Sequence, residues 1–356
     1  MKVLVAMSGG VDSSVAAARL VEAGHDVIGV TLKLWSGPDG EMPTAGCCTV
    51  SDAEDARRVA AQLDIPYYVL DYTEDFSSGV VDGFVADYLS GRTPNPCVEC
   101  NRTVKFSRLL SQAEEFGCEK VATGHYARVE PVGDGYRLRR GVDSDKDQSY
   151  VLSMLAQDQL ARLSFPVGEM VKSEVRALAA DLGLRTAAKA ESMAICFVGR
   201  RDYRSFLRSQ APEALQPGVL VTVDGTPVGS HDGVAGFTIG QRRGLGVALG
   251  EPQYVVDVDA SSQTVTIGSR EHLMCDAVEL SSVTWTHSPL VPGAPTSVQY
   301  RAHGEAVDAI WIGDGSVVFH EPQSAVAPGQ TAAMFSGDEV LGGGIIARVI
   351  RSSPTG

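Results

Sequence analysis

The sequence predicts an α/β domain built on a parallel sheet, followed by a small β-rich central domain and a C-terminal β-barrel domain. Strand-like and helix-like patterns alternate near the N-terminus, which is typical of a parallel sheet with right-handed crossovers. After about residue 205 the helical periodicity gives way to short alternating runs separated by Gly, Asp and Pro, which favour an all-β region. A length of 356 residues allows two to three domains, and we place them at residues 1–205, 206–270 and 271–356.

The strands of the first domain are expected where short apolar runs are bounded by turn residues. Residues 2–7 (KVLVAM) have the composition of a buried strand that leads into a glycine-rich turn. Further strands are predicted at residues 25–33, 65–70 and 120–123, the last of which ends at Gly124.

Two helices are predicted between these strands. Residues 12–23 carry alanine-rich apolar positions at helical spacing and stop at Gly24. Residues 51–63 begin with Ser51, and Glu54 follows three positions later, which is the pattern of a capping box. The resulting order of strand, helix, strand, helix, strand predicts the parallel sheet of the first domain.

The strands expected in the two C-terminal domains are short. They are predicted at residues 218–223, 254–258, 264–267, 306–312 and 316–319. The proline-containing residues 288–295 are predicted to form a loop.

The composition is that of a globular chain without a membrane anchor. Hydrophobic residues make up 44% and charged residues 21%, so the chain can bury a core and lacks the signature of disorder. No apolar run approaches the roughly 20 residues that span a bilayer, and Met1 leads into a strand rather than a signal peptide. We therefore expect a cytoplasmic protein with no membrane partner. Its seven cysteines, an odd number, favour thiol or metal chemistry over a disulfide framework.

The charge of the chain is acidic overall but uneven. Lys plus Arg number 30 and Asp plus Glu 44, a net charge of −14, which by itself argues against a nucleic-acid partner. Residues 1–100 hold 6 basic and 15 acidic residues, whereas residues 101–200 hold 15 and 13. A cationic surface can therefore exist within this acidic protein. Its arginines occur in small groups, namely Arg137, Arg139 and Arg140, then Arg200, Arg201, Arg204 and Arg208, then Arg242 and Arg243.

The sharpest local signal is the string SGGVDSS at residues 8–14, here called the phosphate loop, between the first strand and the first helix. Two glycines let the backbone turn tightly, and the following helix N-terminus presents unpaired N–H donors and partial positive charge. Such a turn binds an anion. It is not a Walker A loop, because no Gly-Lys-[Ser/Thr] follows, and it is not a dinucleotide fingerprint.

This string resembles the PP-loop of the N-type ATP pyrophosphatases, which cleave ATP between its α and β phosphates and adenylate an oxygen of the substrate. The resemblance implies an adenine nucleotide alpha hydrolase-like domain that uses ATP. It also implies Mg²⁺ near Asp12, since a bare carboxylate beside phosphate would otherwise be repelled. The residues that it implicates in ATP binding are Ala6, Met7, Ser8, Gly9, Gly10, Val11, Asp12, Ser13, Leu32 and Gly124.

The cysteines offer a second candidate site. Residues 91–101 (GRTPNPCVECN) are interrupted by prolines, so we expect a shaped loop rather than a regular helix or central strand. The Cys97-x₂-Cys100 spacing on it suits half of a zinc site, a redox pair or iron–sulfur ligands, and no second Cys-x₂-Cys completes a zinc site. The adjacent Cys47 and Cys48 have the wrong spacing. Cys196, flanked by Ile and Phe, has by itself the pattern of a buried cysteine.

Several longer motifs together resemble the bacterial tRNA-specific 2-thiouridylase family, whose members replace the C2 oxygen of the wobble uridine of certain tRNAs with sulfur. The resemblance runs nearly end to end and is far more specific than any single motif. The motifs are residues 8–13, 91–101, 122–126 (ATGHY), 146–150 (KDQSY), 165–169 (FPVGE), 195–197 (ICF), 238–246 (TIGQRRGLG) and 341–346 (LGGGII).

The resemblance implies a role for individual residues. Cys100 and Cys196 match the two catalytic cysteines, and Cys196 is the one that carries the incoming sulfur as a persulfide. The matches to target-base contacts are Asn95, Pro96 and Cys97, and those to tRNA contacts are Lys146, Asp147, Gln148, Gln299 and Tyr300. Many members have Asp where this chain has Cys97. That third thiol keeps open an iron–sulfur cluster ligated by Cys97, Cys100 and Cys196.

The implied chemistry explains why these parts occur together. A uridine C2 oxygen is a poor leaving group, so ATP would adenylate it, with release of pyrophosphate, and AMP would then depart. The Cys196 persulfide would deliver sulfur, and Cys100 would either free hydrosulfide from it or resolve it as a disulfide. The partners implied are tRNA and a persulfide donor or relay protein.

Alternative interpretations remain at this level. The chain could be a PP-loop ligase that adenylates a small molecule, or an iron–sulfur RNA-binding protein with a vestigial PP-loop. His125 is equally consistent with orienting phosphate or base and with a structural role. The arginines from Arg200 to Arg208, and Arg242 and Arg243, favour phosphate-backbone contact in a tRNA enzyme, although a solvated helix face has the same pattern.

Overall fold

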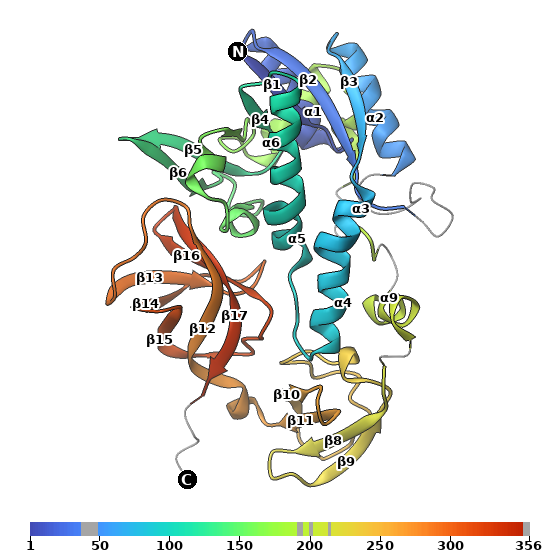
Figure 1. The fold of residues 1–356 in the computed structure, drawn as a ribbon, viewed down its shortest axis with the longest axis vertical. Coiled ribbons are helices and arrows are strands. Elements are labelled where there is room, and N and C mark those ends of the chain that lie inside the picture. The colour runs from blue at the N-terminus through green and yellow to red at the C-terminus, as the bar shows by residue number, and fades with distance from the viewer. Residues whose placement is uncertain (37–48, 191–194, 199–201, 213–214, 352–356) are drawn as a thin grey trace.

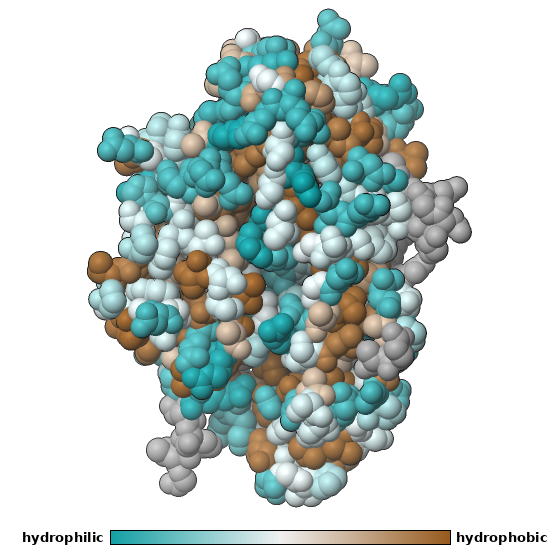
Figure 2. Space-filling model, viewed as in Figure 1, coloured by the Kyte–Doolittle hydropathy of each residue, from teal (hydrophilic) through white to brown (hydrophobic). Residues whose placement is uncertain are grey.

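The computed structural model describes residues 1–36, 49–190, 195–198, 202–212 and 215–351. Figure 1 shows the N-terminal domain at the top, the barrel to one side below it, and the small central domain at the bottom. No helix in these ranges is long and apolar enough to cross a bilayer. Apolar side chains form patches over the barrel and the central domain in Figure 2. The exposed large apolar residues of these two domains include Val291, Ile312 and Val219.

The N-terminal domain is built on a five-stranded parallel sheet with the order β3-β2-β1-β4-β7. The chain adds β2 and β3 on one side of β1, and then β4 and β7 on the other side. Ligands of such sheets bind at the carboxyl ends of the strands where this direction changes. That point lies between β1 and β4, which the phosphate loop and Gly124 respectively follow. The strands are β1 (Lys2–Ala6), β2 (Asp26–Lys33), β3 (Tyr67–Asp71), β4 (Lys120–Ala122) and β7 (Leu163–Ser164).

Helices surround this sheet and continue below it toward the other domains (Figure 1). Helix α1 buries its alanine-rich face against the sheet, as its spacing predicts. The α-helices are α1 (Val11–Glu22), α2 (Val50–Gln62), α3 (Thr73–Phe76), α4 (Asp82–Leu89), α5 (Pro96–Glu99), α6 (Phe106–Glu115), α7 (Gln157–Leu160), α8 (Lys172–Asp181) and α9 (Tyr203–Gln210).

The predicted capping box of the second helix is wrong by two residues. Thr49 is the N-cap of α2: its hydroxyl accepts from the Asp52 N–H at 3.1 Å, and the Asp52 carboxylate accepts from the Thr49 N–H at 2.8 Å. Aspartate closes the reciprocal pair as glutamate would. Ser51 and Glu54 therefore lie inside the helix, where Glu54 pairs with Arg57 and Arg58 on the surface.

The expectation of an irregular loop through residues 97–101 is also wrong. Helix α5 begins at Pro96, the π-helical turn Cys100–Lys105 follows it, and α6 continues from there. Proline is tolerated at the first helical position because its missing N–H would have no intrahelical partner there. Asn95 caps the helix by accepting from the N–H groups of Cys97 and Val98 at 3.2 and 3.3 Å. Only the residues before Pro96 form the predicted irregular loop.

The central domain is a four-stranded sheet with the order β10-β11-β8-β9, close to the predicted strand positions. Its strands are β8 (Gly218–Thr222), β9 (Pro227–His231), β10 (Tyr254–Asp259) and β11 (Thr264–Gly268). The pairing of β8 with β11 is parallel, and the other two pairings are antiparallel.

The C-terminal domain is the predicted barrel, because β12 pairs with β17 and closes the sheet. Its strands are β12 (Met274–Trp285), β13 (Ala294–Gln299), β14 (Val307–Gly313), β15 (Ser316–Ser324), β16 (Thr331–Ser336) and β17 (Glu339–Ile350). A hairpin from the N-terminal part of the chain, β5 (Ala127–Val132) and β6 (Gly135–Arg140), extends this sheet: β6 pairs with β17. Sequence reasoning missed this hairpin, although Gly133-Asp134 between two strand-like runs has the pattern of a two-residue hairpin turn.

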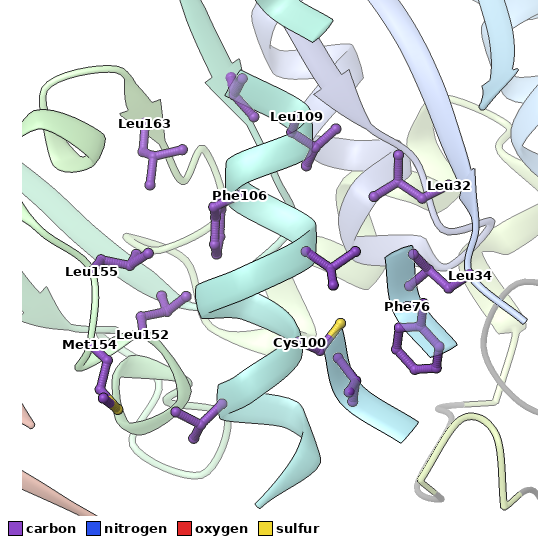
Figure 3. Close-up of a cluster of buried hydrophobic side chains, with 14 of the residues drawn as sticks. Leu32, Leu34, Phe76, Cys100, Phe106, Leu109, Leu152, Met154, Leu155 and Leu163 are labelled. Carbon is purple, nitrogen blue, oxygen red and sulfur yellow. The ribbon is translucent and has the colours of Figure 1, made fainter. Parts of the chain in front are cut away.

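The largest apolar cluster crosses the boundary between the N-terminal domain and the barrel. It joins Phe76, Cys100 and Phe106 of the first domain with Leu138 of the hairpin and Phe335 of the barrel, all of them buried. Figure 3 shows part of this cluster around the helix that carries Cys100 and Phe106. Since burial of a large apolar side chain contributes about 1.5–3 kcal/mol, the cluster holds the two domains together.

Candidate active site

The phosphate loop is held in shape by its own side chains. The Ser8 N–H donates to the Ser13 hydroxyl at 3.1 Å, and the Ser14 hydroxyl donates to the Gly10 carbonyl at 2.8 Å. Gly9 has φ +71°, and a methyl group there would overlap the backbone carbonyl of Asp52 on α2. The loop thus requires glycine at position 9 for two reasons, its left-handed conformation and its close packing on α2.

Lys189 fixes the orientation of a peptide in this loop. Its ammonium donates to the Gly9 carbonyl at 2.9 Å and to the carboxylates of Asp52 and Asp55 at 2.7 and 2.6 Å. Because carbonyl and N–H point to opposite sides of a trans peptide, the Gly10 N–H is directed away from Lys189. Burial raises the pKa of Asp52, but hydrogen bonds from Lys189 and Thr49 outweigh it and the net pKa is lowered. Both partners stay ionised at neutral pH.

Asp12 is already neutralised within the chain. Both of its carboxylate oxygens accept from the Lys172 ammonium at 2.8 Å, and one accepts from the Tyr126 hydroxyl at 2.7 Å. Lys172 therefore brings a cation to the first turn of α1, next to the phosphate loop. A phosphate bound there would meet Lys172 as well as the carboxylate.

The remaining residues predicted to bind ATP line the carboxyl ends of β1, β2 and β4. Gly124 packs directly on the first turn of α1, because a methyl group there would lie 2.6 Å from the Ser13 nitrogen. The side chain of Leu32 is buried in the cluster of Figure 3. Ala6, Met7 and Val11 flank the phosphate loop, and the side chains of Met7 and Val11 are buried. The structure thus collects the predicted residues at one edge of the sheet.

His125 has a packing role. Its ring lies 5.8 Å from the Phe106 ring and 6.0 Å from the Phe165 ring, and its Nδ1 is 2.6 Å from the Thr123 hydroxyl. Burial, together with Lys105, lowers the pKa of His125 to about 3. A neutral ring cannot serve as a cation for phosphate, so the geometry favours the structural alternative.

The two candidate catalytic thiols lie in the same part of the molecule. Cys100 is buried in the large apolar cluster, and Figure 3 shows it on the side of its helix that faces Phe76 and Leu34. Cys196 is half-buried and packs against the same cluster. Its neighbour Phe197 has its ring 5.7 Å from that of Phe76. Both cysteines belong to the part of the cluster that contains Leu34, which follows β2, and the Phe197 ring next to Cys196 lies 6.2 Å from the Trp35 ring.

The three cysteines proposed as cluster ligands are not arranged as a ligand set. Cys97 is exposed, Cys100 buried and Cys196 half-buried. Across the described ranges, no group of three or more His, Cys, Asp or Glu side chains is placed to hold a metal ion. The iron–sulfur alternative thus gains no support from the geometry. Cys47 and Cys48 lie outside the described residues.

The residues predicted to contact tRNA from two distant parts of the sequence meet at Arg140. The Arg140 guanidinium donates to Asp147 at 2.7 Å and to the Gln299 side-chain oxygen at 3.2 and 3.3 Å, and it lies 3.8 Å from the centre of the Phe335 ring. Asp147 and Gln299 are largely buried. Their side chains bind Arg140 and so join the first domain to the barrel.

The other predicted tRNA contacts are more accessible. Gln148 is exposed, and its side-chain oxygen accepts from the Tyr126 N–H at 3.0 Å, which links it to the tyrosine that binds Asp12. Lys146 is half-buried. Tyr300 lines a small surface pocket with Arg301 and Gly304.

The first of the three arginine groups does not form a free cationic surface. Arg137, Arg139 and Arg140 are all engaged in ion pairs, the first two with residues of the β16–β17 turn, Glu339 and Asp338. The hairpin and the barrel are therefore joined by charge as well as by backbone pairing. Arg242, Arg243 and Arg208 are exposed. Arg204 is half-buried, and Arg200 and Arg201 lie outside the described residues.

Comparison with known proteins agrees with this arrangement. Three family models match in order along the chain, described as a tRNA methyl transferase HUP domain (residues 1–200), a tRNA methyl transferase PRC-barrel domain (204–269) and an aminomethyltransferase beta-barrel domain (276–346). A tRNA-specific 2-thiouridylase MnmA from Roseiflexus sp. strain RS-1 is 49% identical, over 98% of this chain and 99% of that one. The chain belongs to the tRNA-specific 2-thiouridylase family.

Other members of the thiouridylase family are equally complete matches. Those from Herpetosiphon aurantiacus and Geobacter metallireducens are each 47% identical, over 97% of this chain and 98% and 96% of theirs. A solved 4-thiouridine synthetase–RNA complex with bound ATP has a TM-score of 0.38 and 17% identity, over 60% of this chain and 51% of that one. That likeness is too distant to carry an argument.

Four residues of this thiouridylase-family chain were missed by sequence reasoning. Lys172 and Lys189 belong to no recognisable motif, and only folding brings them to the phosphate loop. Tyr126 stands in the ATGHY motif, which was a usable signal. Arg140 was assigned to a basic group, although Asp147 seven residues later is a plausible ion-pair partner within a loop.

Proposed function

We propose that this protein is an ATP-dependent tRNA-uridine 2-sulfurtransferase that thiolates the wobble uridine. One observation carries the proposal: in a chain of the thiouridylase family, the phosphate loop follows β1, and Cys100 and Cys196 belong to the cluster that contains Leu32 and Leu34 at the end of the neighbouring strand β2. A small-molecule ligase would need neither the thiols nor the two β domains.

The phosphate loop supplies the first step. ATP would place its pyrophosphate end against the loop N–H groups and the start of α1, where unpaired donors and partial positive charge favour an anion. The uridine C2 oxygen attacks the α phosphorus, and pyrophosphate leaves. Lys172 would offset part of the negative charge of the departing group. Mg²⁺ binds through one or two carboxylates plus phosphates and water. Asp12 is the carboxylate of this loop, and it would hold the ion if Lys172 turned from its oxygens to the phosphate.

The thiols supply the second step. The persulfide of Cys196 attacks the activated C2, AMP leaves with the former C2 oxygen, and Cys100 attacks the Cys196 sulfur to free the thiolated base. Alternatively, Cys100 attacks the persulfide first and the released hydrosulfide attacks C2. Both routes leave a Cys100–Cys196 disulfide, which an external thiol must reduce before the next turnover.

The target uridine must leave the anticodon stack to reach these groups, at a cost of about a few kcal/mol. The site offers residues 91–97, here called the base-contact segment, as its wall. Asn95, Pro96 and Cys97 would contact the base, while Gln148 and Tyr300 are the more accessible of the proposed tRNA contacts. The partners are therefore tRNA and a persulfide donor.

The direct test is thiolation of unmodified tRNA by the purified protein with ATP, Mg²⁺ and a persulfide donor, followed by nucleoside mass spectrometry. We expect 2-thiouridine to form in proportion to the AMP released. Absence of 2-thiouridine with tRNA bound and a competent donor would reject the proposal.

Replacement of the sulfur carrier separates the two steps. In Cys196→Ser, thiolation should be abolished, because the hydroxyl cannot hold a persulfide, while tRNA binding stays near normal. Pyrophosphate release should continue with tRNA present. Retained thiolation would remove Cys196 from the mechanism.

A further inference from the structure

The base-contact segment is held by both of the other domains. It connects α4 to α5, and in Figure 1 this connection runs between the barrel and the central domain. At its start, Gly91 has φ +75° and lies against β10: a methyl group there would be 2.7 Å from the Val258 carbonyl oxygen. The central domain thus fixes one end of the segment.

The barrel holds the middle of the segment by its backbone. The Thr93 N–H donates to the Pro328 carbonyl at 2.8 Å, and the Gln330 side-chain amide donates to the Thr93 carbonyl at 2.8 Å and to the Pro94 carbonyl at 3.4 Å. Between them, Gly329 has φ +91°, and a methyl group there would lie 2.9 Å from the Thr93 nitrogen and oxygen. Such a close approach leaves the segment little freedom.

The same barrel turn reaches Asn95 through Tyr150. The Tyr150 hydroxyl donates to the Thr331 carbonyl at 2.9 Å and also interacts with the Asn95 side chain. Asn95 in turn caps the helix that carries Cys97 and Cys100. Tyr150 is buried, and burial raises its pKa to about 12, so the hydroxyl remains a donor at physiological pH.

The turn itself is rigid enough to act as a template. Its two central residues are fixed to β17, since the Gly329 N–H donates to the Ile346 carbonyl and the Ile346 N–H donates to the Gln330 carbonyl, both at 2.8 Å. The base-contact segment has prolines at 94 and 96, which have no N–H and limit its own hydrogen bonding. Its conformation is therefore set largely by its partners.

We propose that the barrel turn 328–331 positions the base-contact segment for the reaction, and that Gln330 is the positioning residue whose side chain does this. The role rests on the proposed function, because the segment matters as the wall against which the extruded uridine lies. Gln330 suits the role because its amide is the side-chain donor that meets two consecutive carbonyls of the segment. The barrel thus shapes the catalytic site from another domain.

Two variants of Gln330 test the role. Gln330→Met keeps the length of the side chain and removes the donor, whereas Gln330→Glu directs a negative charge at two carbonyl oxygens. Gln62→Met is a matched control, since Gln62 also donates to a distant backbone carbonyl, that of Leu182 at 2.7 Å, away from the site.

The readouts separate positioning from folding and from ATP use. We expect kcat for tRNA thiolation to fall by about tenfold in Gln330→Met and by about a hundredfold in Gln330→Glu, as displaced reacting groups do. The dissociation constants for ATP and for tRNA should change less than about twofold. Gln62→Met should match the wild type, and circular dichroism should show that all variants are folded.

Hydrogen exchange tests the inference independently of activity. Exchange of the amides in residues 91–97 should accelerate in both Gln330 variants, while β16 and β17 stay protected. Wild-type kcat together with unchanged exchange in Gln330→Met would overturn the inference. If the wild type itself forms no 2-thiouridine, the proposed function fails, and unchanged exchange would then also reject the positioning role.

Discussion

The phosphate loop and the base-contact segment are built in opposite ways. The phosphate loop is held by hydrogen bonds among its own residues, Ser8 to Ser13 and Ser14 to Gly10, within one strand-to-helix turn. The base-contact segment is held by Val258, Pro328 and Gln330, which lie more than 150 residues away in two other domains. The phosphate loop is therefore built within one domain, with Lys172 and Lys189 of that domain beside it, whereas the conformation of the base-contact segment depends on the assembly of three domains.

A physical reason explains the difference. A phosphate is a compact anion that any ring of backbone N–H donors can bind, so a short turn suffices. An extruded base is a flat, partly apolar group that needs walls on several sides. Helices and sheets from one domain provide one wall, and the others must come from elsewhere in the fold.

The largest loss of activity is expected from a substitution at Gly9, where the phosphate loop packs tightly on α2. Gly9→Ala places a methyl group against the Asp52 carbonyl at a left-handed φ, so either the loop or α2 must shift. We expect thiolation to fall by about a hundredfold, which corresponds to ~3 kcal/mol in transition-state binding. Steady-state kinetics with varied ATP measures this loss.

Gly10→Ala is the matched comparison for stability. Gly10 has φ −90°, and a methyl group there meets only the Ser8 hydroxyl, at 3.5 Å. Its melting temperature should stay close to that of the wild type, whereas that of Gly9→Ala should fall by several degrees. Equal melting temperatures for the two variants would show that the close packing on α2 is not needed.

The next substitution tests whether the phosphate loop needs the distant Lys189 to bind ATP. Lys189→Met removes the ammonium that holds the Gly9 carbonyl and leaves Asp52 and Asp55 without their cation. We expect KM for ATP to rise by about tenfold, or ~1.4 kcal/mol, with kcat changed less. Lys33→Met, which breaks the surface pair with Asp71, is the control. An unchanged KM in Lys189→Met would show that the loop binds ATP without the contact from Lys189 to Gly9.

A smaller effect concerns His125, beside the loop but assigned to packing. The unfolded chain binds a proton on this histidine near pH 6.5, and the folded chain only near pH 3. Its contribution to stability is therefore present above about pH 6.5 and is lost as the pH falls toward 3. In the wild type, the free energy of unfolding should fall by up to ~1.4 kcal/mol per pH unit across this range because of His125. In His125→Phe this fall should be absent. Urea unfolding at several pH values measures it, and parallel pH profiles for the two proteins would show that the fold does not keep His125 neutral.

The smallest effect is expected in the base-contact segment. Cys97→Asp introduces the residue that the family resemblance suggests, at an exposed position in the first turn of α5 where an anion is favoured by about 0.3–1 kcal/mol. Thiolation should stay within about twofold of the wild type. A dead variant, together with iron in the anaerobically purified wild type, would revive the iron–sulfur alternative.

Sequence reasoning succeeded where structure follows local pattern. The strands predicted for the parallel sheet and the central domain, and helix α1, lie within a few residues of their predicted places, because apolar periodicity and turn residues specify them. Strands β7 and β9 of these two sheets were not predicted. Sequence reasoning failed at the start of α2, where Thr49 and Asp52 form a less obvious capping box, and at Pro96, where a proline begins a helix instead of interrupting it. Both errors are boundary errors with a local physical cause.

Other failures concern pairings between distant parts of the chain, which no local pattern specifies. The β5–β6 hairpin joins the barrel because the start of β17, 200 residues later, pairs with β6. Two arginines of that hairpin form ion pairs with Glu339 and Asp338, so they are not available to bind phosphate. Part of the positive charge of residues 101–200 is thus neutralised by ion pairs within the protein. A count of charges along the chain cannot detect such pairing.

The sequence by itself determined the family, the phosphate loop and the identity of the candidate thiols, because each depends on residue types at short spacing. The tertiary structure alone decided that Lys189 and Lys172 serve the phosphate loop, that Asp147 and Gln299 meet at Arg140, and that Gln330 holds the base-contact segment. These are contacts between residues up to 237 positions apart. Only the packing of three domains places them within hydrogen-bonding distance.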